Sequence, residues 1–271
     1  MMRKVGIVAA FVLWMGVGSL WAQEKIVVGG AGAIRDDMQE LAKVYMAKHP
    51  SDSIVVLMDA MSTTGGIEGT KAGRLTIGLI TRPPRDHEKG GLVYRPIALT
   101  PAGVGVHKSM PVNSLSEAQV CDIFGGKIKS WREVGAGDGK IVVLTRKRVD
   151  DANTKAFQEK MACFRDLTIS PEAVVLVRGG EVLDAIDRRP GTIGIVNAAT
   201  ASTTRPNVKR LAIGGVLPSV EALQSGKYRY TNETGAITLG EPKGLAKRFL
   251  ELVAGPDGQK ILAKGGAVAV R

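Results

Sequence analysis

The chain has 271 residues and a formal net charge of +11. A chain of this length suits one or two domains and buries enough surface to fold without disulfides or metal ions. Its basic residues are spread along the sequence, and no nucleic-acid-binding motif or row of aromatic residues accompanies them, so a nucleic-acid partner is not expected. Two interpretations of the charge stay open: a solvated basic surface, or a positive field that attracts anionic solutes.

The first residues, MMRKVGIVAAFVLWMGVGSLWAQEK, have the pattern of a secretory signal peptide. Two basic residues precede an apolar run over 5–17, and Leu20-Trp21-Ala22 offers a cleavage site. An uncleaved membrane anchor is the alternative, but it needs about 20 apolar residues, and this run is shorter and interrupted by Gly16 and Gly18. We therefore predict a signal peptide over residues 1–22, cleavage after Ala22, and export to the periplasm.

After the signal peptide, short apolar runs alternate with amphipathic segments, which is typical of an α/β fold with largely parallel sheets. Four apolar residues between Ile34 and Tyr45, spaced 4, 3 and 4 apart, predict a helix over 36–48 with one apolar face. The Ser-Leu-Ser-Glu stretch at 114–117 has the spacing of a capping box. Strands are expected at 25–28, 54–58, 75–80, 102–107, 140–144, 192–196, 208–213 and 236–239. Further helices are expected at 66–72, 154–163, 181–187, 219–224, 242–253 and 256–264.

The number of strands and the lack of a linker or internal repeat suit two lobes between which the chain crosses. Crossings are expected near 96–100 and 198–203. The expected division is a first lobe of residues 23–100 and 206–271 and a second lobe of residues 101–205. Cys121 and Cys163 then both fall in the second lobe, and we predict that they pair, because an exported protein meets an oxidising environment.

The stretch MDAMSTTGGIEG, residues 58–69, combines hydroxyl groups and glycines where a strand gives way to a helix. Ser62, Thr63 and Thr64 stand directly before Gly65. Such side chains can cap the helix, since a Thr at the N-cap satisfies its first N–H groups. They can also help the free N–H groups of the helix to hold an anion. The residues alone leave both interpretations open.

Seven segments of the chain stand out together, in this order: IVVGGAGAI, STTGGIEG, LTIGLITRPPRDHE, CDIFGGKIKSWREVG, PGTIGIVN, IGGVLPSVEALQSGKYRY and FLELVAGPDGQKILAKGGAVAV. They resemble the segments of periplasmic phosphate-binding proteins, the solute receptors of ABC transporters. The resemblance implies the two-lobed α/β fold of type II periplasmic binding proteins, with a ligand cleft at the hinge. It also implies a monomer without a cofactor, which binds phosphate or another small inorganic oxyanion and delivers it to an ABC permease in the inner membrane.

Carried over residue by residue, the resemblance implies that ligand-binding groups come from several loops of the chain. The expected ligand residues are Ala31, Gly32, Ser62, Thr63, Thr64, Gly65, Thr81, Arg82, Arg146 and Asn153. Whether Arg82 points into the cleft or lies on the lobe surface stays open.

Two positions depart from the family pattern. Ile34 stands where family members carry a threonine in the first loop, and Asp151 stands at the first position of their Ser-Gly-Thr loop. A carboxylate at 151 repels phosphate unless it is protonated or paired with Arg146 or Arg148. In a second interpretation, Asp150 and Asp151 are helix N-terminal charges favoured by the dipole. Phosphate is therefore expected to bind more weakly than in intact family members, or a different ligand is expected to be preferred.

Other classes of protein fit less well. A hydrolase needs a nucleophile beside a base, but the chain has no Gly-x-Ser-x-Gly stretch, and we do not expect an enzyme. The first glycine loop lacks the last glycine of a dinucleotide fingerprint, where Arg35 stands instead. The scattered histidines and cysteines have no metal-ligand spacing. The alternative that stays open is a receptor-like module that has lost phosphate binding and serves in protein interaction or sensing.

Overall fold

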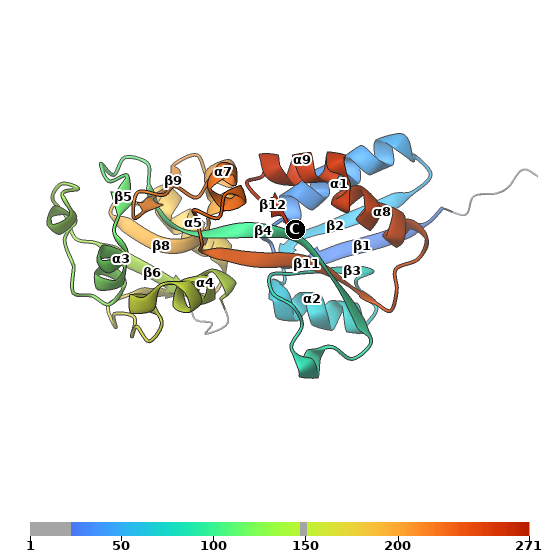
Figure 1. Ribbon diagram of the computed structural model, residues 1–271, viewed down its shortest axis with the longest axis horizontal. Coiled ribbons are helices and arrows are strands. Elements are labelled where there is room, and N and C mark those ends of the chain that lie inside the picture. Colours follow the sequence, from blue (N-terminus) through green and yellow to red (C-terminus); the bar gives the residue numbers. More distant parts are fainter. Residues whose placement is uncertain (1–22, 147–150, 271) are drawn as a thin grey trace, which may run out of the picture.

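The computed structural model describes residues 23–146 and 151–270, so the expected signal peptide, residues 1–22, lies outside the described residues. Two α/β lobes lie side by side along the long axis of the molecule (Figure 1). A sheet runs through both lobes, with the strand order β2-β1-β3-β11-β4-β8-β6-β7. No helix in the described ranges combines the length and the apolar character needed to cross a membrane.

The first lobe holds the strands at one end of this order. Its strands are β1 (Lys25–Gly30), β2 (Ser53–Ala60), β3 (Ile77–Ile80), β11 (Thr231–Leu239), the beginning of β4 (Leu92–His107) and β12 (Val268–Ala269). β1 is parallel to β2 and β3, whereas β11 is antiparallel to β3 and β4. One face is covered by α1 (Arg35–Lys48), α8 (Gly244–Ala254) and α9 (Pro256–Lys264), and the other by α2 (Ser62–Lys71), as Figure 1 shows.

The second lobe continues the sheet from the end of β4. Its strands are β8 (Thr192–Asn197), β6 (Val142–Arg146), β7 (Val174–Leu176) and β9 (Val208–Arg210), with the small pair β5 (Ser114–Leu115) and β10 (Ala212–Ile213) beside them. Its helices are α3 (Glu117–Phe124), α4 (Ala152–Lys160), α5 (Gly179–Arg188), α6 (Ala198–Thr204) and α7 (Val220–Gln224). Three short 3₁₀ turns complete the elements: η1 (Asp86–Glu88), η2 (Trp131–Val134) and η3 (Ala162–Phe164).

Apolar periodicity explains why these segments fold as they do. Along α1, Ile34 and Met38 are fully buried in the core of the first lobe and Tyr45 is 4% exposed, so the apolar face predicted from the spacing is confirmed. In the second lobe, Trp131 is buried beside several phenylalanines, and its indole N–H donates to the carbonyl of Gly191 at 3.1 Å. Each lobe thus has its own core, and the space between the lobes is left for the cleft.

The cap of α3 differs from the expected one. Ser116, rather than Ser114, is the N-cap residue; it accepts from the N–H of Gln119 at 3.1 Å, and the Gln119 side chain accepts from Ser116 in return. Ser114 belongs to β5 instead, where it pairs with Ala212. The capping box therefore lies two residues further along, because the strand pairing fixes the residues before it.

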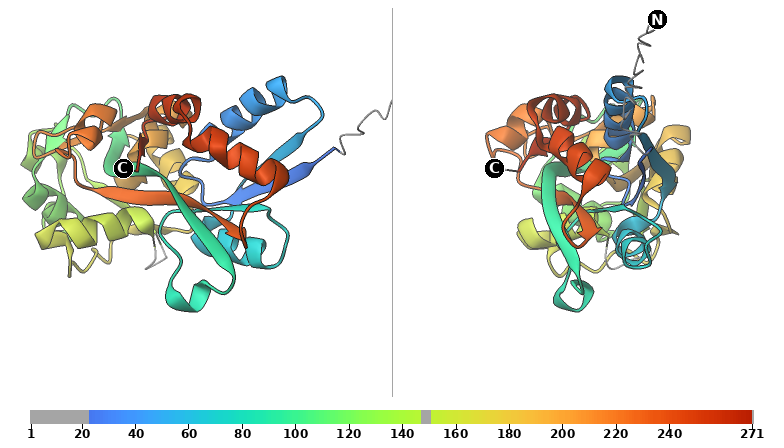
Figure 2. Two further views of the ribbon diagram at one scale, coloured as in Figure 1. Left: turned by 45° about the vertical axis from the view of Figure 1, so that its right-hand side comes forward. Right: turned by 90° about the vertical axis from the view of Figure 1, so that its right-hand side faces the viewer.

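Two long strands connect the lobes. β4 continues from one lobe into the other, and β11 runs beside it with Thr231 opposite Pro101 (Figure 2). The first crossing therefore falls just after the expected 96–100, at the strand pairing near Pro101. Residues 198–203 are not a crossing, since they form most of α6, whose N-cap is Asn197.

The second crossing lies near residue 230, not near 205. β9 pairs with the last residues of β4, and Leu211 and Leu223 belong to the core of the second lobe. Residues 206–230, which the sequence analysis assigned to the first lobe, thus pack on the second. Their apolar side chains complete a core whose other buried members lie between 102 and 195, apart from Val268. Composition along the chain does not reveal this.

Cys121 of α3 and Cys163 of η3 are joined by a disulfide in the second lobe. The two residues are 42 positions apart, so the bond ties α3 to the turn that follows α4.

Candidate functional site

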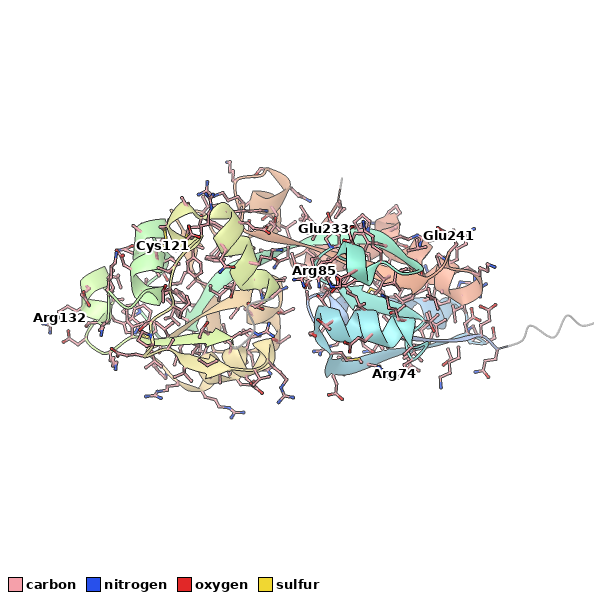
Figure 3. The ribbon with its side chains drawn as sticks, turned by 90° about the horizontal axis from the view of Figure 1, so that it is seen from below. Arg74, Arg85, Cys121, Arg132, Glu233 and Glu241 are labelled. Carbon is pink, nitrogen blue, oxygen red and sulfur yellow. A yellow bond between two sulfur atoms is a disulfide. The ribbon has the colours of Figure 1, made fainter. Side chains whose placement is uncertain are left out.

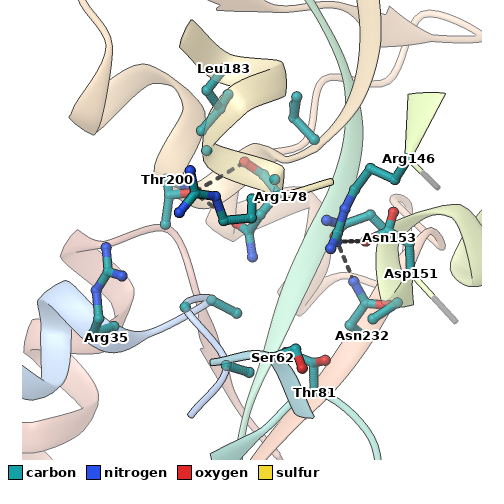
Figure 4. Close-up of a pocket in the computed structure, with 18 of the residues that line it drawn as sticks. Arg35, Ser62, Thr81, Arg146, Asp151, Asn153, Arg178, Leu183, Thr200 and Asn232 are labelled. Atoms are coloured by element: carbon teal, nitrogen blue, oxygen red, sulfur yellow. Dashed lines mark hydrogen bonds and ion pairs between the residues drawn. The ribbon is translucent and has the colours of Figure 1, made fainter. Parts of the chain in front are cut away.

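A cavity of about 340 Å³ lies between the lobes. The first lobe contributes the loop after β1, the first turn of α2 and the end of β3; the second contributes the end of β6 and the first turns of α4 and α5. Figure 4 shows side chains from both lobes facing this space. These are the carboxyl ends of parallel strands, where open α/β sheets bind their ligands. We call this cavity the cleft.

The first loop is held against β3. Gly30 has φ of +127°, and the N–H of Ala31 donates to the carbonyl of Leu79 at 2.8 Å. A Cβ on Gly30 would collide with the backbone of Leu79, so glycine is required for this approach. Ala31 and Gly32 line the cleft.

Ile34 does not line the cleft. Its side chain is fully buried in the core of the first lobe, and it occupies the N-cap position of α1 without a side-chain cap. The residue that departs from the family pattern in the first loop therefore serves packing in this protein, which a position in a motif could not reveal.

The hydroxyl-rich stretch forms the first turn of α2. The helix begins at Ser62, earlier than the expected 66, and no side chain caps it at Met61. The Thr63 hydroxyl lies 2.9 Å from that of Thr81 and accepts from the Thr81 N–H at 3.1 Å, so it ties α2 to the end of β3. Thr64 is exposed at the cleft. The hydroxyls are thus part of the first turn itself, where the Ser62 hydroxyl accepts from the N–H of Gly65 at 3.5 Å.

Gly66 allows α2 to approach β3, and Gly65 leaves room for the Met61 side chain. A Cβ on Gly66 would lie 2.6 Å from the carbonyl oxygen of Leu79, and one on Gly65 would lie 2.8 Å from the Met61 side chain. Gly65, an expected ligand residue, is not among the residues that line the cleft.

Arg82 lines the cleft, but its guanidinium is already paired with a carboxylate of the same lobe. The two terminal nitrogens donate to the carboxylate of Glu88 at 2.6 and 2.8 Å. This hydrogen bond is the main reason why the pKa of Glu88 is lowered to about 2. The bidentate pair fixes Arg82 in place, so a ligand in the cleft meets an arginine whose charge is already partly compensated.

Arg146 and Asp151 form an ion pair at the end of β6. Asp151 is 4% exposed and caps α4 by accepting from the N–H and the hydroxyl of Thr154 at 3.1 and 3.0 Å. Arg146 also donates to the carbonyl of Val177 at 3.3 Å. Of the two arginines expected as partners for the Asp151 carboxylate, Arg146 therefore pairs with it; Arg148 lies outside the described residues.

Asn153 lies in the same turn and connects the two sides of the cleft. Its side-chain oxygen accepts from the amide of Asn232, on β11, at 2.8 Å, and Figure 4 shows the two residues facing each other. Asn232 was not expected from the sequence, because it follows no recognisable motif and lies far from the other site residues in the chain.

Three further arginines line the cleft without having been predicted. Arg178 stands before α5 and pairs with Glu181 at 2.9 Å, whereas Arg205 pairs with Asp184 at 2.6 Å. The third, Arg35, lies in the first turn of α1. The signal for Arg178 was present, since VRGG joins a strand to a helix as the first two loops do. Five arginines and two aspartates line the cleft, an arrangement that favours anions.

Nothing in the described ranges suggests a metal centre, since they hold no group of three His, Cys, Asp or Glu residues placed for an ion.

Two α/β lobes around an arginine-lined cleft define a two-lobed solute-binding protein of type II topology. A family model described as "PBP superfamily domain" matches residues 18–257, and the chain belongs to this family. "Phosphate-binding protein PstS" of Bacillus subtilis is 28% identical over 242 residues, with 88% of this chain and 78% of the relative covered.

Solved structures agree with this assignment. A Clostridium perfringens crystal structure, described as that of a phosphate ABC transporter substrate-binding protein with bound phosphate, is 25% identical with a TM-score of 0.78 and covers 91% of this chain and 100% of its own. An ABC-type phosphate transport receptor from Vibrio cholerae is 20% identical with a TM-score of 0.63, covers 91% of this chain and 100% of its own, and is similar in fold.

Proposed function

We propose that the protein is an exported receptor that binds phosphate or a related small oxyanion in the cleft and delivers it to an ABC permease in the inner membrane. The observation that carries the proposal is the convergence on one cavity of the first turns of α2 and α4, exposed hydroxyls and several arginines. Helix N-termini and arginines are the groups that hold oxyanions in proteins. The names of the relatives support the same ligand class.

The mechanism follows from the position of the cleft between two lobes that share β4 and β11. An anion held by groups from both lobes stabilises the conformation in which the lobes are closed. The closed, monomeric protein then docks on the permease. Because closure depends on the ligand, the permease can distinguish ligand-bound receptors from ligand-free ones. The chemistry is binding and release, with no bond of the ligand made or broken.

We assign hydrogen bonds to the anion to two sets of groups. These are the side chains of Ser62, Thr64, Thr81 and Arg146 and the backbone of Ala31 and Gly32. Thr64 is the sharpest test, because its hydroxyl is exposed at the cleft and no hydrogen bond to it is seen elsewhere in the described residues. A hydrogen bond to a charged group contributes about 1.5–3 kcal/mol. Its loss corresponds to about a 10- to 100-fold change in affinity.

The test is calorimetry of the mature protein with phosphate, sulfate, molybdate and arsenate. We expect at least one of them to bind with one site per chain, and Thr64→Val to weaken that binding by about tenfold or more. Thr76→Val is the control, since Thr76 is exposed on the same lobe but outside the cleft, where its hydroxyl accepts from the N–H of Val27 at 3.1 Å. Equal affinities of both variants and the parent would remove the first turn of α2 from the site.

A second candidate function is a receptor-like module without an anion, which serves in protein interaction or sensing. The observation in its favour is that Arg82 and Arg146 already hold carboxylates of the same chain. If none of the oxyanions binds the mature protein in calorimetry, this second function replaces the first.

A further inference from the structure

A second cavity, of about 350 Å³, opens from the cleft on the side of α4. The two cavities share five lining residues: Thr63, Thr81, Arg82, Ala152 and Asn232. The second cavity extends from there between the 81–85 loop of the first lobe and the outer turns of α4 in the second. Figure 3 views the molecule from this side, with Arg85 and Glu233 labelled at the junction of the lobes. We call it the adjoining pocket.

The adjoining pocket has cationic side chains from both lobes. Arg85 comes from the first lobe, and Lys155 and Lys160 come from successive turns of α4. Two carboxylates, Glu159 and Glu233, also line it. With Arg82, four cationic and two acidic side chains surround this cavity, so its lining is electropositive.

The two acidic groups of the adjoining pocket compensate its cations only in part. Glu233 accepts from the hydroxyl of Tyr94 at 2.6 Å, within the first lobe. Glu159 forms only an exposed pair with Lys155, at 3.5 Å, and exposed pairs of this kind contribute little. The Lys155 ammonium is therefore available to an anion at small cost.

Lys160 reaches across to β11. Its ammonium donates to the hydroxyl of Thr231 at 2.9 Å, a neutral partner. Partial burial lowers the pKa of Lys160, and Glu159 opposes this only in part. A neutral hydroxyl compensates an ammonium poorly, so an anion in the pocket would be a better partner for Lys160.

We propose that the cleft and the adjoining pocket together bind an elongated polyanion, with a phosphoryl group in the cleft and a second anionic group between Arg85, Lys155 and Lys160. The ligand class is a diphosphate or a phosphonate or phosphate ester that carries a carboxylate. The inference rests on the proposed function, since the phosphoryl group uses the same anchor. Each cavity alone reaches the size of about 300–1,000 Å³ typical of sites for small organic molecules, and a single tetrahedral oxyanion leaves the adjoining pocket unused.

The test compares inorganic pyrophosphate and phosphonoacetate with phosphate, by calorimetry in the presence of a chelator that removes divalent cations. We expect one pyrophosphate per chain, bound about tenfold or more tightly than phosphate, and displacement of phosphate by pyrophosphate. Phosphonoacetate distinguishes a diphosphate from a carboxylate-bearing ligand by its rank relative to pyrophosphate; tighter binding of either probe than of phosphate supports the inference.

The decisive variant is Lys155→Gln combined with Lys160→Gln. It should weaken pyrophosphate binding by about tenfold or more and change phosphate binding by less than about twofold, because only the longer anion extends from the cleft to the later residues of α4. Lys247→Gln is the control: Lys247 pairs with Glu251 four residues later on the exposed face of α8, as Lys155 does with Glu159 on α4. Phosphate binding without tighter pyrophosphate or phosphonoacetate binding would overturn this inference and leave the proposed function standing. Failure of all three anions to bind would overturn this inference, whereas the proposed function fails only if sulfate, molybdate and arsenate do not bind either.

Discussion

Asp37→Asn should make the stability of the protein less dependent on pH. Asp37 lies in the first turn of α1, with its carboxylate packed against the backbone of Gly265. Burial raises the pKa of Asp37 from 3.8 to about 7, and the neighbouring charge of Asp36 adds to the effect. Because the folded-state pKa lies above the unfolded one, the folded state binds this proton more tightly. The resulting stabilisation is complete below about pH 4 and is lost as the pH rises through about 7.

The magnitude follows from the difference between the two pKa values. At about 1.4 kcal/mol per pH unit, moving the pKa from 3.8 to about 7 corresponds to about 4 kcal/mol. The dipole of α1 favours the ionised form by up to about 1 kcal/mol, which leaves about 3 kcal/mol. About 1 kcal/mol of this is already lost at pH 4.5, which lies above the unfolded pKa of 3.8. We therefore expect the free energy of unfolding of Asp37→Asn, relative to the parent, to be about 2 kcal/mol more favourable at pH 8 than at pH 4.5.

The assay is urea unfolding followed by circular dichroism at several pH values from 4.5 to 8.5. Asp36→Asn serves as the control, since it removes the adjacent charge but not the buried one; it should change the pH dependence much less. Parallel stability curves for Asp37→Asn and the parent would refute the argument from burial.

Two further predictions concern the second lobe. Replacing Cys121 and Cys163 together by alanine should lower the free energy of unfolding by about 4 kcal/mol in the chain-entropy model for a separation of 42 residues, as measured by urea unfolding without reductant; an unchanged midpoint would contradict it. Asp151→Ser keeps an effective N-cap residue for α4 but removes the carboxylate that Arg146 holds. Calorimetry should then show phosphate binding at least tenfold tighter than in the parent, and equal or weaker binding would mean that the carboxylate is not what limits affinity.

Local patterns in the sequence predicted the elements well where one physical rule dominates. The apolar spacing from Ile34 to Tyr45 depends only on helical periodicity, and the whole stripe is buried. The first half of β4 was missed, because Arg95 and Pro96 interrupt any alternation there; it forms because β11 pairs with it along its length. Residues 206–230 were assigned to the wrong side of the crossing, because an apolar residue such as Leu211 does not say which core it joins.

In the candidate site, too, local patterns were predictable from the sequence and tertiary contacts were not. Motif positions located the loops that meet at the cleft, and all expected ligand residues except Gly65 line it. The direction of a side chain could not be inferred: Ile34 stands at a position where family members carry a threonine in the ligand loop, but in this protein its side chain faces the core. Partners that are distant in the chain, such as Asn232 for Asn153, depend on the tertiary fold alone.

The position of β11 in the sheet sets the order in which the protein can be assembled. In the first lobe β11 lies between β3 and β4, in the middle of the sheet, although it is close to the end of the chain. The second lobe, in contrast, is one continuous stretch between the two crossings. We expect the second lobe to fold first. The first lobe can complete its sheet only after β11 has joined it, which requires a loop closure that spans most of the chain. A chain truncated before residue 231 would therefore retain a folded second lobe beside a first lobe whose sheet is interrupted at its centre.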